Sequence, residues 1–172
     1  MNKPSAWDVG YAFAMAIACL LSYEVITELP GFQFEGHRDS IAGIWAAVST
    51  AFVFRDTRQR SLSAGAGRLI ATFVSFALCL PYLWFIPANV AGMGILLVAG
   101  TLTMVLLGRR EDITTTAITT IVVMVVAVSN PAEAWKQPLL RLFDTVVGIV
   151  IGVAAKWVAS FVFYRAKGEP IR

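Results

Sequence analysis

The sequence is poor in charge and in the residues that build metal and redox sites. Only 15% of its 172 residues are charged, and it contains one histidine and two cysteines. An ordinary soluble domain carries about 25% charged residues. Metal centres need clustered Cys, His or acidic ligands, and a disulfide framework needs several cysteines. We therefore expect no metal, no cofactor and no disulfide framework, and the composition is not that of a soluble domain.

Phosphate-binding and catalytic motifs are also missing from the sequence. It has no glycine-rich phosphate loop, so we do not expect ATP-driven transport by this chain itself. It has no recognisable pairing of a nucleophile with a base, so we do not expect an enzyme. The net charge is +3, and the sequence contains no other feature that indicates nucleic-acid binding. This charge indicates membrane topology, and we expect no nucleic-acid partner.

What the chain has is apolar sequence, with 58% hydrophobic residues and a mean hydropathy of +0.71. A membrane-spanning helix needs about 20 mostly apolar residues. Apolar runs broken by charge and proline predict six such helices, at about 9–29, 40–54, 63–83, 88–107, 113–128 and 139–164. We expect Pro81 to loosen the end of the third. The prediction is an all-α polytopic membrane protein, a single domain over 1–172 with no soluble domain.

Lysine and arginine are distributed unevenly over the predicted loops. One set of loops carries Lys3, Arg55, Arg58, Arg60, Arg109, Arg110, Arg165, Lys167 and Arg172, and the other set carries Arg38 and Lys136. Cytoplasmic loops are enriched in these residues. We therefore expect a multi-pass protein of the bacterial inner (plasma) membrane with both termini in the cytoplasm. The cytoplasmic arginines are expected to bind anionic lipid heads.

Two segments resemble each other, "RLIATFVS" from Arg68 and "RLFDTVVG" from Arg141. Each opens the third helix of a three-helix unit, the first at about 9–83 and the second at about 88–164. Because three spans is an odd number, two such units lie in opposite orientations. That arrangement is an inverted repeat, which many secondary transporters use to build a site near the membrane midplane. Chance similarity between two apolar helices is the alternative.

The two arginines have two interpretations. They are anchors whose side chains reach the interface, or they are fixed cations that bind an anion near the positive ends of two helices. Asp144 stands three residues after Arg141, at the spacing of an ion pair on a helix. Such a pair would lower the cost of burial, and Asp144 could exchange a proton.

Threonines form a second polar group in the fifth helix. Thr115 and Thr119 make one stripe at helical spacing, and Thr116 and Thr120 make the next. They bind carbonyl groups of their own helix, or they face a substrate path. Asp112 precedes this helix as a candidate cap.

Other residues carry open alternatives. Glu24, near the outer end of the first helix, is interfacial or carries protons. Lys156 snorkels to the cytoplasmic face, or forms an anion site. Gly148 and Gly152 form a GxxxG motif, which serves helix packing within the bundle or a dimer seam. His37, the one histidine, is expected at the surface of the outer loop.

The segments "GRLIATFVSFA" and "LRLFDTVVGIVIG" resemble a motif of the fusaric acid resistance and aromatic acid exporter family. The match consists of the arginine, the threonine four residues later and a small residue after it. Arg68, Thr72 and Ser75 supply these in the first copy, and Arg141, Thr145 and Gly148 supply them in the second. Asp144 fits the Asp-Thr form of the motif, whereas Ala71 and Ser75 stand where glycines are usual.

The resemblance implies a six-helix membrane module that exports small, often aromatic, carboxylic acids with the proton gradient. Because many family members carry two membrane halves, we expect this chain to form a homo-oligomer. Candidate substrate-binding residues are Arg68, Thr72, Thr115, Thr119, Arg141, Asp144 and Thr145. Candidate proton-coupling residues are Asp144 and Glu24. The alternatives are a non-transporting scaffold or accessory subunit, and a small oligomeric channel.

Overall fold

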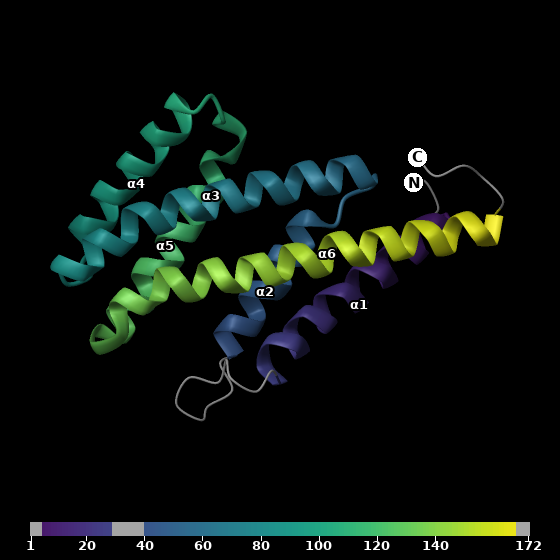
Figure 1. Ribbon diagram of the computed structural model, residues 1–172, viewed down its shortest axis with the longest axis horizontal. Coiled ribbons are helices and arrows are strands. Elements are labelled where there is room, and N and C mark those ends of the chain that lie inside the picture. The colour runs from purple at the N-terminus through teal and green to yellow at the C-terminus, as the bar shows by residue number, and fades with distance from the viewer. Residues whose placement is uncertain (1–4, 29–39, 168–172) are drawn as a thin grey trace. The chain divides into compact units, whose positions relative to one another are not determined.

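A computed structural model describes residues 5–28 and 40–167, and these residues form helices and turns without a strand. Figure 1 shows the six α-helices. They are α1 (Ala6–Glu28), α2 (Ser40–Val53), α3 (Arg58–Phe85), α4 (Val90–Leu106), α5 (Ile113–Ser129) and α6 (Gln137–Lys167). Short 3-10 helices precede α5 (η2, Arg110–Asp112) and α6 (η3, Pro131–Lys136). The predicted all-α fold with six helices is confirmed.

Four segments are long and apolar enough to cross a membrane: Trp7–Glu28, Arg58–Phe85, Arg110–Ser129 and Pro131–Val162. Helices α2 and α4 are apolar but have only 14 and 17 residues. A spanning helix has about 20 residues, in a range that begins at about 17, so α2 is below this range and α4 is at its lower limit. The chain is therefore a multi-pass membrane protein, while crossing by α2 and α4 stays a prediction.

Helix α3 is longer than predicted at both ends. It begins at Arg58 rather than near Ser63, because the Thr57 side-chain oxygen accepts a hydrogen bond from the Arg60 amide at 3.2 Å and caps the helix. It also continues through Pro81 to Phe85, so the proline does not end the helix, and a loosening near its end stays a prediction. Polar capping, which a hydropathy pattern does not register, sets the first of these boundaries.

The helices form two compact units. One contains Met1–Ala66 and Val146–Arg172, and the other contains Gly67–Thr145. We call them unit 1 and unit 2. Helices α3 and α6 each contribute one part to each unit. These boundaries follow packing, whereas the predicted repeats at about 9–83 and 88–164 follow sequence similarity, so the inverted repeat stays a prediction.

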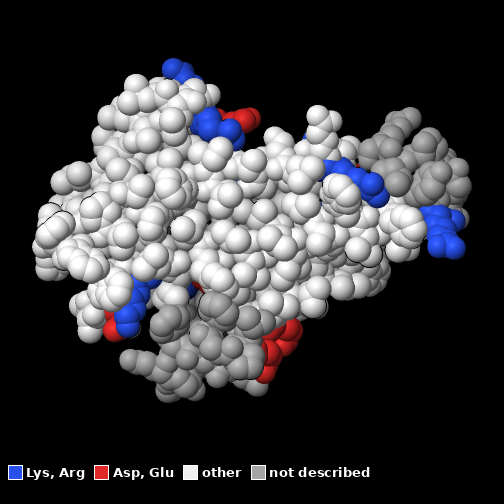
Figure 2. All heavy atoms as spheres, in the orientation of Figure 1, with Lys and Arg blue, Asp and Glu red and all other residues white. Residues whose placement is uncertain are grey.

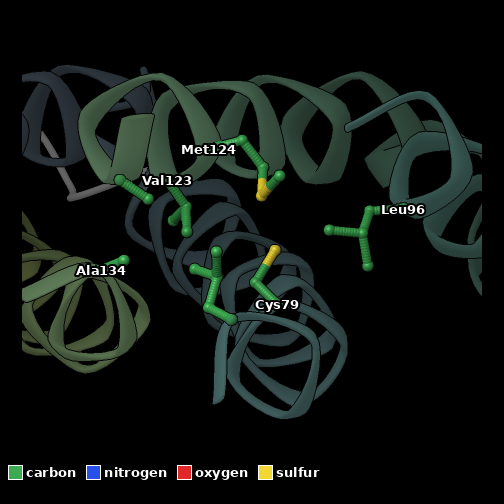
Figure 3. Packing of buried hydrophobic residues seen from close by; sticks show 7 residues of the cluster. Cys79, Leu96, Val123, Met124 and Ala134 are labelled. Atoms are coloured by element: carbon green, nitrogen blue, oxygen red, sulfur yellow. The ribbon is translucent and has the colours of Figure 1, made fainter. Parts of the chain in front are cut away.

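Unit 2 has an apolar core that joins α3, α4, α5 and η3. Its buried residues are Cys79, Leu83, Leu96, Val123, Met124, Ala127 and Ala134, and Figure 3 shows them converging. Cys79 is fully buried in this cluster as a free thiol, as expected for a packing residue. The core holds α3 and α5, which carry the predicted site residues Arg68, Thr72, Thr115 and Thr119.

In unit 1, α6 lies against α2 through two glycines. A Cβ atom added to Gly148 would lie 2.8 Å from the Ser49 Cβ, and one added to Gly152 would lie 3.1 Å from the Thr50 carbonyl oxygen. The Thr50 hydroxyl donates a hydrogen bond to the Gly148 carbonyl at 2.9 Å. The GxxxG motif therefore lets the α2 and α6 backbones approach closely within one chain.

The surface is apolar, as a bilayer requires. Large hydrophobic side chains are exposed along the helices, among them Phe13 at 67%, Leu20 at 65% and Leu106 at 87%. In the view of Figure 2 uncharged atoms cover most of the described surface, and charged atoms gather in separate patches.

Candidate functional site

An ion pair is buried near the start of α6, in unit 2. The Arg141 Nη2 atom lies 3.2 Å from the Asp144 Oδ2 atom, and the two side chains are only 1% and 3% exposed. Residues three apart on a helix lie on the same face, so the helix itself brings this pair together. Each charge lowers the cost of burying the other, so removal of one partner would raise the cost of burying the one that stays.

Thr145 shares this buried face but uses its hydroxyl within the helix. Its Oγ1 donates a hydrogen bond to the Arg141 carbonyl at 2.7 Å, and its side chain is fully buried. The donor is therefore occupied, and the oxygen lone pairs remain the part of Thr145 that could meet another group.

Helix α3 carries a second buried polar face in the same unit. Arg68, Thr72 and Ser75 are 2%, 1% and 0% exposed, at positions one helical turn apart. The Ser75 hydroxyl donates to the Thr116 carbonyl at 3.0 Å and lies 3.0 Å from the Thr120 hydroxyl, which joins α3 to α5. The Thr72 Oγ1 atom is buried and has no hydrogen-bond partner among the described residues.

The threonines of α5 divide into buried and half-buried members. Thr116, Thr119 and Thr120 are each 1% exposed, while Thr115 is half-buried at the edge of that face. The Thr116 and Thr119 hydroxyls donate to carbonyls four residues earlier, at 3.1 and 2.9 Å. Binding to their own helix therefore takes up these two protons, as the first alternative expected.

The sequence does not predict that Ser75 contacts Thr116 and Thr120. It identifies Ser75 as a small residue of the motif and Thr120 as part of a threonine stripe. The position of Ser75, seven residues after Arg68 on the same face of the helix, was the available signal. The partner of Ser75 lies more than 40 residues away, and a sequence pattern does not supply that contact.

The expected cap of α5 is wrong. Asp112 makes no side-chain cap hydrogen bond, and its carboxylate accepts a hydrogen bond from the Arg109 Nε atom at 2.7 Å instead. A hydrogen bond between two charged groups is stronger than one to a neutral amide, so the Asp112 carboxylate pairs with Arg109 rather than with a backbone amide of α5. A Cβ atom at Gly67 would lie 2.7 Å from the Asp112 Oδ1 atom, so this pair packs against α3 directly before Arg68.

The buried faces of α3 and α6 follow the same positions of the aligned segments. In α3 the buried residues include Arg68, Ala71, Thr72, Ser75, Cys79 and Leu83; in α6 they include Arg141, Asp144, Thr145, Gly148, Gly152 and Lys156. Each residue of the first set aligns with the corresponding residue of the second. The alignment therefore matches two buried faces as well as two sequences, and Asp144 stands where the first copy has Ala71.

The other candidates lie in unit 1. Glu24 is exposed on α1. Lys156 is only 5% exposed, with its ammonium group among aromatic rings. His37 lies outside the described residues. Within the described ranges, no group of three or more His, Cys, Asp or Glu residues could hold a metal ion.

Comparison with known proteins places these residues in a family. The family model described as fusaric acid resistance protein-like matches residues 25–155, which include both arginine motifs. No curated protein and no solved structure matches the chain. The resemblance inferred from the two motifs is confirmed, and the family is one of transporter-type membrane proteins. The chain belongs to the fusaric acid resistance protein-like family.

Proposed function

We propose that this protein is an inner-membrane efflux transporter of small organic carboxylate anions, with aromatic carboxylates as the expected class, and that it is coupled to protons. The buried Arg141–Asp144 ion pair is the observation that carries the proposal. Family membership supports membrane transport, and the charge and geometry of the site support the substrate class and the coupling.

The burial of Arg141 favours anion binding over anchoring. An anchoring arginine extends toward the headgroups, where water covers its guanidinium group. Arg141 is instead enclosed by protein, with 1% of its side chain exposed. A lone arginine at the centre of a span costs about 2.5–3.5 kcal/mol on insertion scales, so its pairing with Asp144 makes its position tolerable.

The pair suggests how a carboxylate and a proton are coupled. The planar guanidinium group binds a carboxylate through two parallel hydrogen bonds. A substrate carboxylate that takes the place of Asp144 on Arg141 would break this ion pair. Asp144 then takes up a proton, and it releases the proton when the substrate leaves and the ion pair forms again. Glu24 is the second candidate for proton coupling, and its exposed position on α1 makes it an entry point rather than part of the pair.

Helices α3 and α5 supply the remaining polar groups. Arg68 provides a second buried cation, and the Thr72 hydroxyl, whose Oγ1 has no partner among described residues, is free to bind a substrate oxygen. Thr115 and Thr119 are the weaker candidates, because the Thr119 proton is already bound and Thr115 is half-buried. The matching buried faces of α3 and α6 support the inverted repeat as part of this proposal.

The test is transport by the purified protein in sealed vesicles. We expect uptake or release of aromatic carboxylates that depends on an imposed pH gradient, measured beside a panel of aliphatic carboxylates. Flux without dependence on the gradient would favour a channel. Absence of flux, with a stable complex to a second protein, would favour the scaffold or accessory subunit and contradict transport.

We further propose that the transporter is a homo-oligomer. Six helices, two of them short, are few for a complete pathway, and the family often carries two membrane halves. Because Gly148 and Gly152 lie against α2, the seam between copies would use other surfaces. Mass measurement in nanodiscs should give two or more chains, and a monomer that transports would contradict this proposal.

A further inference from the structure

A buried lysine lies in an aromatic box at one end of unit 1. The Lys156 ammonium nitrogen is 5.5, 5.3 and 5.6 Å from the ring centroids of Trp7, Tyr11 and Phe54. The Tyr11 hydroxyl donates to the Phe54 carbonyl at 2.7 Å, and the Trp7 and Tyr11 rings stack at 5.3 Å. The box is therefore held together by its own contacts, and the rings stabilise the cation through their negative faces.

A second cation, Arg58, packs against Trp157, the residue that follows Lys156 in α6. The Arg58 guanidinium group is 5.1 Å from the ring centroid of Trp157, and its Nη2 atom donates to the Trp157 carbonyl at 3.4 Å. The Arg58 Nε atom is buried and has no hydrogen-bond partner among the described residues. A guanidinium group offers five donors, and the Nε donor of Arg58 is left for a further acceptor.

The neighbouring acid does not satisfy these cations. Asp56 interacts electrostatically with Lys156 but forms no ion pair with it in the described part of the chain. It is 65% exposed and lies 3.9 Å from Arg60 instead. Lys156 and Arg58 carry like charges, which the exposed Asp56 counters in part, so a further anion beside the two cations would lower their repulsion. Among the described residues the cluster therefore offers the Arg58 Nε donor and more cations than acids.

We propose that Lys156 and Arg58 form a binding site for the phosphate group of an anionic phospholipid. A phosphate diester brings the several oxygen acceptors that an ammonium and a guanidinium group both bind. Trp7 and Trp157 are 36% and 48% exposed, as aromatic residues at the headgroup level are. Toward the membrane interior, the exposed Val150 and Val146 lie on the same face of α6 as Trp157 and give an acyl chain an apolar surface.

The lipid is a better fit than a soluble phosphate because Lys156, Trp157 with the Arg58 side chain packed on it, and an apolar surface are adjacent along α6. An anionic headgroup is a better fit than a zwitterionic one because a choline group would add a positive charge beside Lys156 and Arg58. The site lies in unit 1, and the proposed substrate residues Arg68, Arg141 and Asp144 lie in unit 2. The lipid site therefore stands independently of the transport proposal.

The test is lipid binding by the full chain, measured by native mass spectrometry of delipidated protein. Phosphatidylglycerol and phosphatidylcholine with the same acyl chains are titrated separately. We expect one tightly bound phosphatidylglycerol per chain and binding of phosphatidylcholine that is about tenfold weaker, because phosphatidylcholine keeps the phosphate acceptors but adds a choline cation beside Lys156 and Arg58. Lys156→Met and Arg58→Gln should each weaken phosphatidylglycerol binding by a similar factor, because each removes a cation and keeps most of the stem.

Arg60→Gln is the matched control, since Arg60 is 74% exposed and belongs to the same end of α3. It should change binding by less than about twofold, because an exposed charge contributes little. An equal loss in Arg60→Gln would show diffuse surface attraction and overturn the site. Equal binding of the two lipids, or of inorganic phosphate and phosphatidylglycerol, would overturn the lipid assignment. If Lys156→Met does not fold, wild-type affinity in Arg58→Gln contradicts the proposal by itself.

Discussion

Arg141 and Asp144 give the most direct test at the scale of single residues. Arg141→Lys should insert normally but transport only in part, because lysine lacks the planar fork that binds a carboxylate. Arg141→Gln should lower anion binding further. Asp144→Asn should change the pH dependence of transport more than it changes folding, since it removes the exchangeable proton and keeps the shape. Flux per inserted molecule across a pH series measures all three.

The anchor interpretation makes different predictions for the same variants. Arg141→Lys would be silent, because lysine anchors as well as arginine does, and Arg141→Gln would affect only insertion or abundance. Three variants that all match wild type per inserted molecule would show that neither side chain takes part in transport.

Thr72 offers a test that separates binding from stability. Its hydroxyl oxygen is buried without a hydrogen-bond partner in the described structure, so Thr72→Val should leave the melting temperature unchanged or raise it. Substrate affinity should fall several-fold if the hydroxyl binds substrate. The comparison is Ser75→Ala, which loses contacts to Thr116 and Thr120 and should cost about 1–2 kcal/mol.

Thermal unfolding in detergent and the substrate dependence of flux measure these two effects. Destabilisation by Thr72→Val equal to that of Ser75→Ala would mean that the hydroxyl supports the fold. Unchanged flux in Thr72→Val would remove this residue from the proposed site.

At the scale of elements, the contact between α6 and α2 depends on Gly148. Alanine there would place a methyl group 2.8 Å from the Ser49 Cβ and against the backbone of α2. Overpacking of this kind costs about 1–3 kcal/mol, and the hydrogen bond from Thr50 would be strained as well. We therefore expect a clear fall in melting temperature for Gly148→Ala.

Gly94 on α4 is the matched control for this change. It is exposed, and nothing lies within 4 Å of an added Cβ atom. Gly94→Ala should be neutral or stabilising by up to about 1 kcal/mol, because alanine favours a helix more than glycine does. Similar behaviour of the two variants would contradict close packing of α2 and α6.

At the scale of the whole molecule, topology is the feature to establish. Trp7, Phe54 and Lys156 meet in one aromatic box, so the start of α1, the end of α2 and the later part of α6 lie at one end of unit 1. These three segments adjoin the N-terminal tail, the loop after α2 and the C-terminal tail, all of which are predicted to be cytoplasmic. This contact supports the proposal that both termini are on the same side as the loop after α2.

Reporter fusions test the full topology. Fusions after Arg60, Arg110 and Arg172 should report the cytoplasm, and fusions near Glu35 and Ala134 should report the outer side, because lysine and arginine are retained inside. An outer location for Arg110 would contradict six spans, and the inverted repeat would be lost with them.

The sequence by itself determined the class of the protein and the short-range part of its site. Composition indicated a membrane protein, and the length of the apolar runs predicted six helices near their observed positions. The Arg141–Asp144 pair was predictable because helix geometry alone brings residues three apart onto one face. Helix ends such as the start of α3 were less predictable, because a polar cap at Thr57 sets that boundary and hydropathy does not.

Only the tertiary structure decided which helix faces are buried and what they meet. In a helix of a soluble protein, the polar face is the one exposed to water. A membrane helix is apolar both on the face toward lipid and on much of the face toward other helices, so its sequence does not show which face packs against the protein. In the structure Ser75 contacts α5 and Gly148 contacts α2. The Lys156 ammonium group lies among rings of α1 and of Phe54, the residue after α2. These contacts join residues 41 to about 150 positions apart and depend on how helices pack, which local sequence patterns do not encode.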